Sequence, residues 1–281
     1  FKCNTMQTSI SIDLGGTNIR VAKVCNNTIV SIKKETCKAQ GTEQEVLQQI
    51  QRMIDELIDC DVTTIGFGIP SIVDTEKGIA YNLVNIPSWK EVHIRTYFEN
   101  QYHVPVKVDN DVNCFVLGEQ RFGSLKGFKD VVGITLGTGV GAGIIINKQL
   151  YRGLKTGAGE IGCLPYLDDC YETYCSSGFF SKHNTTGEQL FKEAKNSNIA
   201  AKRLWEEFGY HLGKLLQVVF YTYAPQAIVI GGGLSQASEF FNYSMIESLH
   251  EGFLYPSELN EATICYSKLS NSNLLGASCL P

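Results

Sequence analysis

Residues 9–24 (SISIDLGGTNIRVAKV) and residues 131–146 (VVGITLGTGVGAGIII) follow one plan: an apolar strand, a turn rich in glycine and threonine, and a second strand. Thr135 in the second copy takes the place of Asp13 in the first. Such a repeat predicts a duplicated fold, with two similar lobes that face each other across a cleft. Glycine turns of this kind can bind anions, because they expose backbone N–H groups and let a phosphate approach closely. Two turns across one cleft would suit a polyphosphate such as ATP.

The composition is that of a globular protein of about two domains, since the chain has 281 residues and a domain has roughly 150. Hydrophobic residues make up 43% of the chain and support a substantial core. A net charge of −5 without a run of Lys or Arg argues against nucleic-acid or anionic-membrane partners. No apolar stretch reaches the roughly 18–20 residues that span a bilayer, and the segment FKCNTMQTSI has no apolar signal-peptide core. The ten cysteines are scattered, so we expect reduced thiols and a cytoplasmic location.

The apolar periodicity and the turn signals predict an α/β fold with mixed sheets flanked by helices. In the first lobe we expect strands at 8–14, 18–25, 28–34, 63–68 and 105–109, and helices at 43–59, near 91–101 and after 109. In the second lobe we expect a hairpin at 131–147, an irregular stretch at 153–178, helices near 186–195, 198–223 and 235–251, and strands at 227–230 and 262–267. Residues 271–280 are expected to form a short helix.

The second glycine turn, residues 137–142 (GTGVGA), also satisfies the loose G-x-G-x-x-A pattern of dinucleotide-binding proteins. That pattern needs a helix after the turn, because the helix N-terminus holds the pyrophosphate. Here the turn runs into residues 143–146 (GIII), whose β-rich pattern argues against a dinucleotide. The remaining alternatives are a phosphate-binding hairpin and a turn that its glycines merely make tight. The P-loop pattern G-x-x-x-x-G-K-[ST] is missing from the sequence.

Four carboxylates stand at positions that suit phosphoryl transfer to a sugar. Asp13 ends the first strand beside its glycine turn, where it could hold the hydration shell of a divalent cation or merely cap the turn. Asp111 follows Asn110 where a strand meets a helix, so it could act as a general base or as the helix N-cap. Glu160 and Glu172 lie in the irregular stretch, where they could bind sugar hydroxyls or be solvated surface charges.

Taken together, these motifs resemble the ROK family (repressor, open reading frame, kinase) of the actin–hexokinase superfamily, over nearly the whole chain. The resemblance rests on the phosphate motifs at 13–20 (DLGGTNIR) and 136–141 (LGTGVG), on Asn-Asp-x-Asn at 110–113, on the turn at 66–70 (GFGIP) and on the strand with three glycines at 225–233. It implies two actin-like (ribonuclease H-like) lobes, which we place at residues 1–111 with 271–281 and at residues 112–270. Family members commonly dimerise, so a homodimer is expected.

The resemblance implies an ATP-dependent kinase that uses Mg²⁺ and phosphorylates a hydroxyl, usually at C6, of a hexose or N-acetylhexosamine. Asp111 would be the general base and Asp13 would hold Mg²⁺ through water, whereas Arg20 is at least as well explained by a structural role. The implied sugar contacts are Gly68, Asn85, Asn110, Glu160, Cys163 and Glu172. The implied ATP contacts are Asp13, Gly15, Gly16, Thr17, Gly137, Thr138, Gly139, Gly231, Gly232 and Gly233.

The sequence departs from the family at its zinc-binding segment. The family's Glu-x-Gly-His, whose histidine touches the sugar and binds zinc with three cysteines, reads Glu-Ile-Gly-Cys at 160–163. Of the family's C-x-C-G-x-x-G-C-x-E segment only Cys-Tyr-Glu at 170–172 remains. We therefore expect Glu172 to be retained and structural zinc to be absent. A rearranged site of Cys163, Cys170, Cys175 and His183 is the alternative, because four nitrogen or sulfur ligands suffice for tetrahedral zinc.

Two questions stay open at the level of sequence. The substrate could be glucose, N-acetylmannosamine, fructose, allose or a glycoside, since a thiol at Cys163 removes an imidazole that would hydrogen-bond the sugar. A non-catalytic protein that senses a sugar or a nucleotide is the rival to the kinase. The retained Asp111 favours the enzyme, and the small room before Asp13 argues against the helix-turn-helix of a ROK repressor.

Overall fold

The computed structural model describes residues 7–281, so residues 1–6 of the amino-terminal segment lie outside it. The chain divides into two compact units. The first contains the residues up to Lys126 together with 150–158 and 269–281, and the second contains 127–149 and 159–268. The division expected from the sequence ended the first lobe at residue 111. The first unit extends further because residues 111–122 form a helix that packs against the carboxy-terminal segment.

The first unit is built on a five-stranded sheet in the order β3-β2-β1-β4-β8. Its strands are β1 (Thr8–Leu14), β2 (Asn18–Cys25), β3 (Thr28–Thr36), β4 (Val62–Ile69) and β8 (Val106–Asn110). The hairpins β1–β2 and β2–β3 are antiparallel, whereas β1, β4 and β8 run parallel. Asp13 therefore lies beside Gly68, and Gly68 lies beside Asp109. The carboxyl ends of three strands thus meet at one edge of the sheet, which is where ligands of α/β sheets usually bind.

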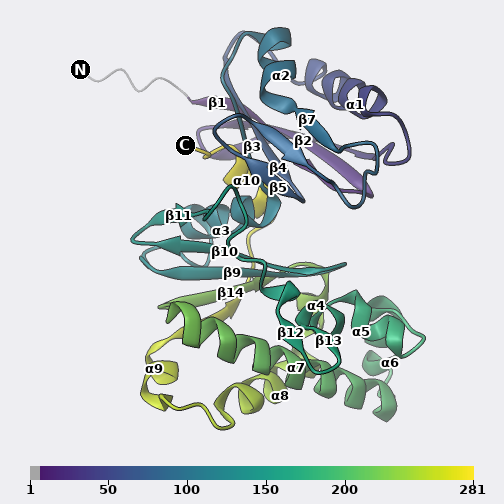
Figure 1. Cartoon of the computed structure of the whole chain (residues 1–281), viewed down its shortest axis with the longest axis vertical. Helices are drawn as coiled ribbons and strands as arrows, with labels where there is room; N and C mark the ends of the chain where they lie inside the picture. Colours follow the sequence, from purple (N-terminus) through teal and green to yellow (C-terminus); the bar gives the residue numbers. More distant parts are fainter. Residues whose placement is uncertain (1–6) are drawn as a thin grey trace. The chain divides into compact units, whose positions relative to one another are not determined.

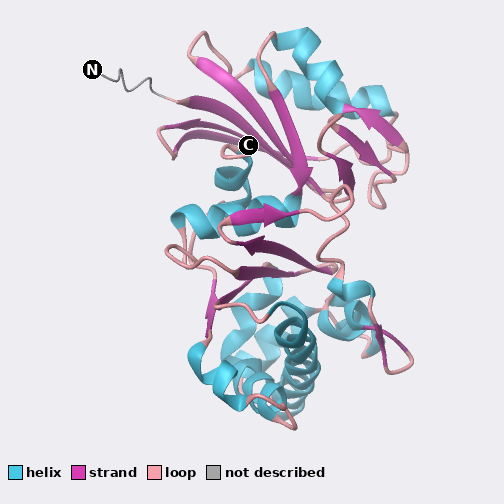
Figure 2. Cartoon of the chain, turned by 60° about the vertical axis from the view of Figure 1, so that its left-hand side comes forward, coloured by secondary structure: helices cyan, strands magenta, loops and turns pink. Residues whose placement is uncertain are grey.

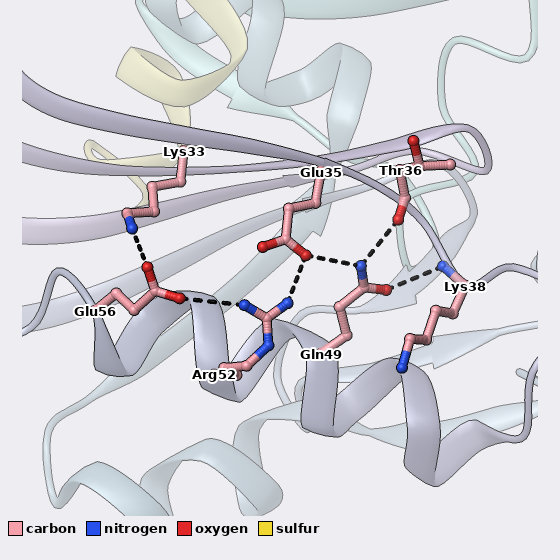
Figure 3. Close-up of polar contacts among 7 residues, drawn as sticks. All are labelled: Lys33, Glu35, Thr36, Lys38, Gln49, Arg52 and Glu56. Carbon is pink, nitrogen blue, oxygen red and sulfur yellow. Dashed lines mark hydrogen bonds and ion pairs between the residues drawn. The ribbon is translucent and has the colours of Figure 1, made fainter.

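Helices α1 (Glu43–Asp55) and α2 (Ile94–Tyr102) lie on one side of this sheet (Figure 1). A capping box between Thr42 and Glu45 starts α1, which ends four residues before the expected end at 59. Its apolar side is buried, and its polar side is tied to β3 through Gln49 and Arg52 (Figure 3). The helix expected from 91 begins at Ile94 instead, because residues 91–93 pair in a small sheet of β5 (Ile72–Asp74), β6 (Ile79–Tyr81) and β7 (Glu91–His93).

Helices α3 (Asp111–Phe122) and α10 (Ser272–Ala277) lie on the other side of the sheet (Figure 1). Their backbones come very close, because a Cβ at Gly276 would overlap the carbonyl oxygen of Cys114 and a Cβ at Gly118 would overlap that of Ser272. Glycine is required at such close approaches.

The second unit is built on a sheet in the order β11-β10-β9-β14-β15, drawn as magenta strands in Figure 2. Its strands are β9 (Val131–Leu136), β10 (Val140–Ile146), β14 (Ala227–Gly231) and β15 (Thr263–Tyr266), together with the edge strand β11 (Gln149–Tyr151), whose last two residues are counted with the first unit. The hairpin β9–β10 is antiparallel, and β14 runs parallel to both β9 and β15. The duplicated fold and its mixed sheets are therefore present, as the repeated hairpin predicted.

The helices of the second unit include the long α7 (Ile199–Tyr223), which packs along α8 (Ser238–His250). The others are α4 (Tyr171–Cys175), α5 (Ser177–Lys182), α6 (Gly187–Lys195) and α9 (Pro256–Glu261). The stretch expected to be irregular holds a 3₁₀ helix (Ile161–Cys163) and a hairpin of β12 (Pro165–Tyr166) and β13 (Asp169–Cys170) as well as α4. A 3₁₀ helix (Gly233–Ala237) precedes α8, where one helix was expected from 235. Within residues 7–281, no helix combines the length and the apolar character needed to cross a membrane.

Candidate functional site

The first glycine turn is held by the two strands that flank it. Gly15 donates its N–H to the Asn18 carbonyl at 2.9 Å, which closes the turn between β1 and β2. Gly16 lies against the loop that carries Asn85, and a Cβ at Gly16 would overlap the Asn85 side chain. Only glycine lets the turn and this loop approach so closely. The structure thus brings Gly15, Gly16 and the predicted sugar contact Asn85 together within the first unit, with Thr17 exposed in the same turn.

Asp13, at the end of β1, forms an ion pair with the residue opposite it in the hairpin. Arg20 donates from Nε at 2.9 Å and from Nη2 at 2.5 Å to Asp13 Oδ2. The other carboxylate oxygen accepts from Asn273 Nδ2 at 3.4 Å, and Arg20 Nη1 donates to Asn271 Oδ1 at 3.0 Å. Arg20 thus holds Asp13 and contacts Asn271 at the start of α10, which are contacts of a structural kind.

The junction of β8 and α3 places the predicted base. Asn110 is the N-cap of α3: its side-chain oxygen accepts from the backbone N–H groups of Val112 at 2.8 Å and Asn113 at 3.3 Å. Its amide donates to the Ser71 carbonyl at 3.3 Å. Because Asn110 fills the cap position, Asp111 is the first residue of the helix rather than its cap. A Cβ at Gly68 would lie 3.4 Å from the Cα of Asp111, so β4 packs directly against this junction.

A buried carboxylate that the sequence did not single out supports this junction. Asp109 is 1% exposed, and its Oδ1 accepts from the N–H of Asn110 and from Asn113 Nδ2, both at 2.8 Å. Its Oδ2 accepts from Arg152 Nε at 2.6 Å. A buried carboxylate needs a cationic or hydrogen-bonding partner. An Asp that ends a predicted strand next to a candidate base could therefore have been recognised in the sequence as a supporting residue. Arg152, from the loop after β11, could not be paired with it by spacing alone.

The second glycine turn contacts one of the predicted sugar ligands. Gly137 donates its N–H to the carbonyl of Gly139 at 3.0 Å. Glu172, from α4, accepts from the N–H of Val140 at 3.1 Å, and a Cβ at Gly139 would overlap its carboxylate. Ser177 Oγ donates to the Thr138 carbonyl at 3.1 Å. Glu172 is therefore tied to the second glycine turn, which belongs to the same unit.

Three consecutive glycines, residues 231–233, lead from β14 into the 3₁₀ helix Gly233–Ala237 next to β9. Gly232 has φ +85°, and a Cβ there would overlap the carbonyl oxygen of Leu136. A cavity of about 290 Å³ in the second unit is lined by Gly137 and Gly233, and by Phe191, Trp205 and Leu234 among others. Gly231 ends β14 beside Thr135. The structure thus brings the two predicted ATP-binding glycine turns of this unit to one partly apolar cavity.

Glu160 is the N-cap of the 3₁₀ helix Ile161–Cys163, and Cys163 is its last residue. Although both residues are exposed overall, partial burial of the carboxyl and the nearby Glu172 raise the pKa of Glu160. Partial burial of the thiol and the charges of Glu160 and Glu172 likewise raise the pKa of Cys163. The thiol is thus held in its neutral form, so Cys163 could offer a sugar only a weak donor and acceptor.

Comparison with known proteins identifies the family. The sequence matches the ROK family over residues 9–281. The chain belongs to the ROK family. A glucokinase of Halalkalibacterium halodurans is 29% identical, with 82% of this chain and 81% of the relative covered. A xylose repressor of Bacillus subtilis is 27% identical, with 82% of this chain and 61% of the repressor covered. Among solved structures, a ROK family glucokinase from Streptomyces griseus in complex with glucose and AMPPNP is 25% identical, with a TM-score of 0.84 and 97% and 98% of the two chains covered.

The segment where ROK family members were expected to bind zinc is organised here around aromatic rings. Tyr166 stacks on Tyr171 with ring centroids 4.2 Å apart, and its hydroxyl lies 3.0 Å from His211 Nδ1. Cys175 is buried, and the His183 ring packs on Phe179 with centroids 4.8 Å apart. Cys170 Sγ lies 3.8 Å from Thr173 Oγ1. In the described part of the chain, no three His, Cys, Asp or Glu side chains are grouped so that they could hold a metal ion.

Proposed function

We propose that this ROK protein is an ATP-dependent kinase that phosphorylates a hydroxyl, the one at C6, of a hexose or N-acetylhexosamine. The observation that carries the proposal is the junction of β8 and α3, where Asn110 caps the helix and Asp111 begins it. A carboxylate at the start of a helix, at the carboxyl end of a strand, could accept the proton of an attacking hydroxyl. The glucokinase relatives and the glucokinase structure with glucose and AMPPNP support the same assignment.

The proposal gives a role to each of the predicted site residues. Asp111 orients and deprotonates the sugar hydroxyl, while Asn85, Asn110, Glu160 and Glu172 accept or donate hydrogen bonds to the other hydroxyls. The backbone N–H groups of the three glycine turns, which include Thr17 and Thr138, hold the phosphates. The cavity of about 290 Å³ beside Gly137 and Gly233 takes the adenine base, because apolar rings line it.

Mg²⁺ is part of the proposed reaction, in which it would neutralise charge on the transferred phosphoryl group. Asp13 offers the hard carboxylate oxygens that Mg²⁺ prefers, and a carboxylate already bonded by Arg20 and Asn273 suits contact through water better than direct ligation. We further propose that structural zinc is absent and that the protein is a cytoplasmic homodimer. One equivalent of zinc in elemental analysis, or a monomer by light scattering, would contradict these two expectations respectively.

The test is coupled ADP release from MgATP across a panel of hexoses, N-acetylhexosamines and a glycoside. Asp111→Asn should lower kcat at least about 100-fold, since a general base contributes roughly 10²–10⁴-fold. Asp61→Asn, an exposed carboxylate in a turn of the same unit, is the matched control and should leave kcat unchanged. Sugar-dependent turnover that survives in Asp111→Asn would overturn the assignment of the base.

A non-catalytic sensor is the second candidate, because the xylose repressor of Bacillus subtilis matches 82% of this chain. Saturable binding of ATP or of a sugar by calorimetry, without turnover on any member of the panel, would favour the sensor over the kinase. Glucose, N-acetylmannosamine, fructose and allose are the sugars to compare first, since Cys163 changes the contact that a histidine makes in typical members.

A further inference from the structure

A cavity of about 380 Å³ in the first unit has no part in the proposed reaction. Its wall includes Thr75, Glu76, Arg95, Lys107, Asp109 and Arg152, and the last two residues of the chain also line it. All of these residues belong to the first unit. A volume near 400 Å³ is at the small end of the range for ligand sites, which is roughly 300–1,000 Å³.

Arg95 brings a positive charge to this cavity and forms no ion pair within residues 7–281. Its guanidinium donates to three backbone carbonyls, those of Val106 at 2.9 Å, Thr75 at 2.8 Å and Glu76. Carbonyl oxygens fix the position of the guanidinium but do not neutralise it. Because a guanidinium has five N–H donors, two remain for a ligand.

Arg152 and Lys107 add further donors. Arg152 uses Nε for Asp109, whereas in residues 7–281 its two terminal amino groups have no protein hydrogen-bond partner. The ammonium of Lys107, a half-buried residue of β8, likewise forms no ion pair within the described residues. Asp109 is already occupied by Arg152, Asn110 and Asn113, and Glu76 is exposed. The donors that remain in the cavity are therefore mainly cationic.

We infer that this cavity is a binding site for a phosphate dianion, either free phosphate or the phosphate group of a small monoester. Arginine forks and lysine ammonium groups are the side chains that bind phosphate oxygens most strongly, and here two Arg and one Lys line one cavity. The remaining volume and the Thr75 hydroxyl would accommodate a short polar tail.

Occupancy of this cavity would act on the residue that supports the proposed base. Arg152 holds Asp109, and Asp109 holds the N–H of Asn110. A phosphate that engages the terminal amino groups of Arg152 would fix this guanidinium and, through Asp109, the N-cap of α3. The site is thus placed to couple the binding of a phosphorylated molecule to the β8–α3 junction.

Calorimetric titration tests the inference without any catalytic readout. Inorganic phosphate and glycerol 3-phosphate are titrated into the full chain, with glycerol as the neutral control and with AMPPNP at saturation so that the glycine turns are filled. Lys107→Ala should weaken binding at least about tenfold, because one charge-assisted contact to phosphate is lost. Lys34→Ala, an exposed lysine on β3, is the matched control and should leave Kd unchanged.

The two ligands separate the two sources of phosphate. Tighter binding of glycerol 3-phosphate would identify a monoester site, and equal or weaker binding than inorganic phosphate would identify a site for the ion. The inference is overturned if neither ligand binds saturably, or if Lys107→Ala and Lys107→Gln both keep the wild-type Kd while retaining the wild-type Tm. The kinase assay plays no part in this outcome, so either proposal can fail without the other.

Discussion

Gly16 sets the distance between the first glycine turn and the loop that carries Asn85. A side chain at Gly16 would overlap the Asn85 side chain, and the backbone of Asn85 would lie only 3.4 Å away. Gly16→Ala should therefore destabilise the protein by about 1–3 kcal/mol and weaken nucleotide binding, because overpacking displaces the loop. Urea unfolding and calorimetry measure the two effects.

Gly137 provides the matched control for that substitution. It occupies the corresponding turn of the second unit, but a Cβ there would meet no atom within 4 Å. Gly137→Ala should change the free energy of unfolding by no more than about 1 kcal/mol, since such a substitution is costly only where the backbone or the space forbids it. Equal destabilisation by both variants would show that the Asn85 contact is unimportant.

Asp109 is expected to act as a positioning residue for Asp111. Asp109→Asn removes the charge that Arg152 pairs with, at a site that is 1% exposed, so we expect a loss of about 2–4 kcal/mol of stability. If Asp109 also orients the β8–α3 junction, kcat should fall with little change in the KM for ATP. Arg152→Lys keeps a cation next to Asp109 and should lose less of both. A stable Asp109→Asn enzyme with wild-type kcat would contradict the positioning role.

The site residues that the sequence predicted are those carried by local motifs. Asp13 and Gly16 lie at the end of a strand and in the turn after it, and Asn110 and Asp111 lie where a strand meets a helix. The structure around these four residues is therefore determined by residues close to them in sequence. The pair Asp109–Arg152 joins residues 43 positions apart, and a hydrophobic pattern carries no information on such a pairing. The role of Asn110 as N-cap also needed the backbone angles, because Asn and Asp are both good caps.

Strong apolar periodicity predicted which helices and strands are present, but it predicted the residues at which they end less accurately. Strands 8–14 and 18–25 have the predicted bounds. The helix expected to reach 59 ends at Asp55, although the apolar pattern continues through Leu57 and Ile58, because these residues form a turn whose N–H groups both bond to Ile54. Helix α9 was missed, since its six residues are too short for a period to be seen.

The aromatic cluster of Tyr166, Tyr171, Tyr174 and His211 makes the segment between the 3₁₀ helix and α5 sensitive to acid. Burial lowers the pKa of His211, so the folded protein keeps this ring neutral while the unfolded chain takes up a proton. The free energy of unfolding should therefore have its full value above the ordinary histidine pKa of about 6.5. It should fall as the pH drops below this value, by at most about 1.4 kcal/mol per pH unit.

Urea unfolding at several pH values between 5 and 8 measures this dependence. The fall below pH 6.5 should be smaller in His211→Gln, because the titrating group is gone. His250→Gln, which replaces an exposed histidine in the last turn of α8, should keep the full dependence. An identical pH profile in the wild type and in His211→Gln would exclude His211 as the cause.

For the whole molecule, the repeat in the sequence corresponds to a repeat in topology. The sheets β3-β2-β1-β4-β8 and β11-β10-β9-β14-β15 share one pattern, in which an antiparallel hairpin is followed by parallel strands. A pattern of glycine turns and apolar strands could therefore predict the duplication. The same pattern could not predict to which of the two units each connecting segment belongs. That choice depends on contacts such as those of α3 with α10, which are far apart in the chain.

The first unit is completed only by the last segment of the chain, which makes α10 a sensitive point of the whole fold. Three glycines allow the backbone of this segment to pack closely against the rest of the unit. A Cβ on Gly276, Gly118 or Gly66 would overlap the backbone carbonyl of Cys114, Ser272 or Ala277, respectively. Gly276→Ala places a methyl group on a backbone carbonyl that cannot move without shifting α3, so it should destabilise the first unit by about 3 kcal/mol or more. Cys279→Ala, on the same segment, is the control and should cost less than about 1 kcal/mol.

Hydrogen exchange followed by mass spectrometry locates the effect of Gly276→Ala. Amides of β1 and β4 should lose protection, because these strands share the core that α10 covers, whereas amides of β9 and β14 should keep it. The expected difference follows from the division of the chain into two compact units, each with its own sheet. Equal loss of protection in both sheets would instead mean that the units unfold as one cooperative body, and the free energy measured for Gly276→Ala would then belong to the whole chain.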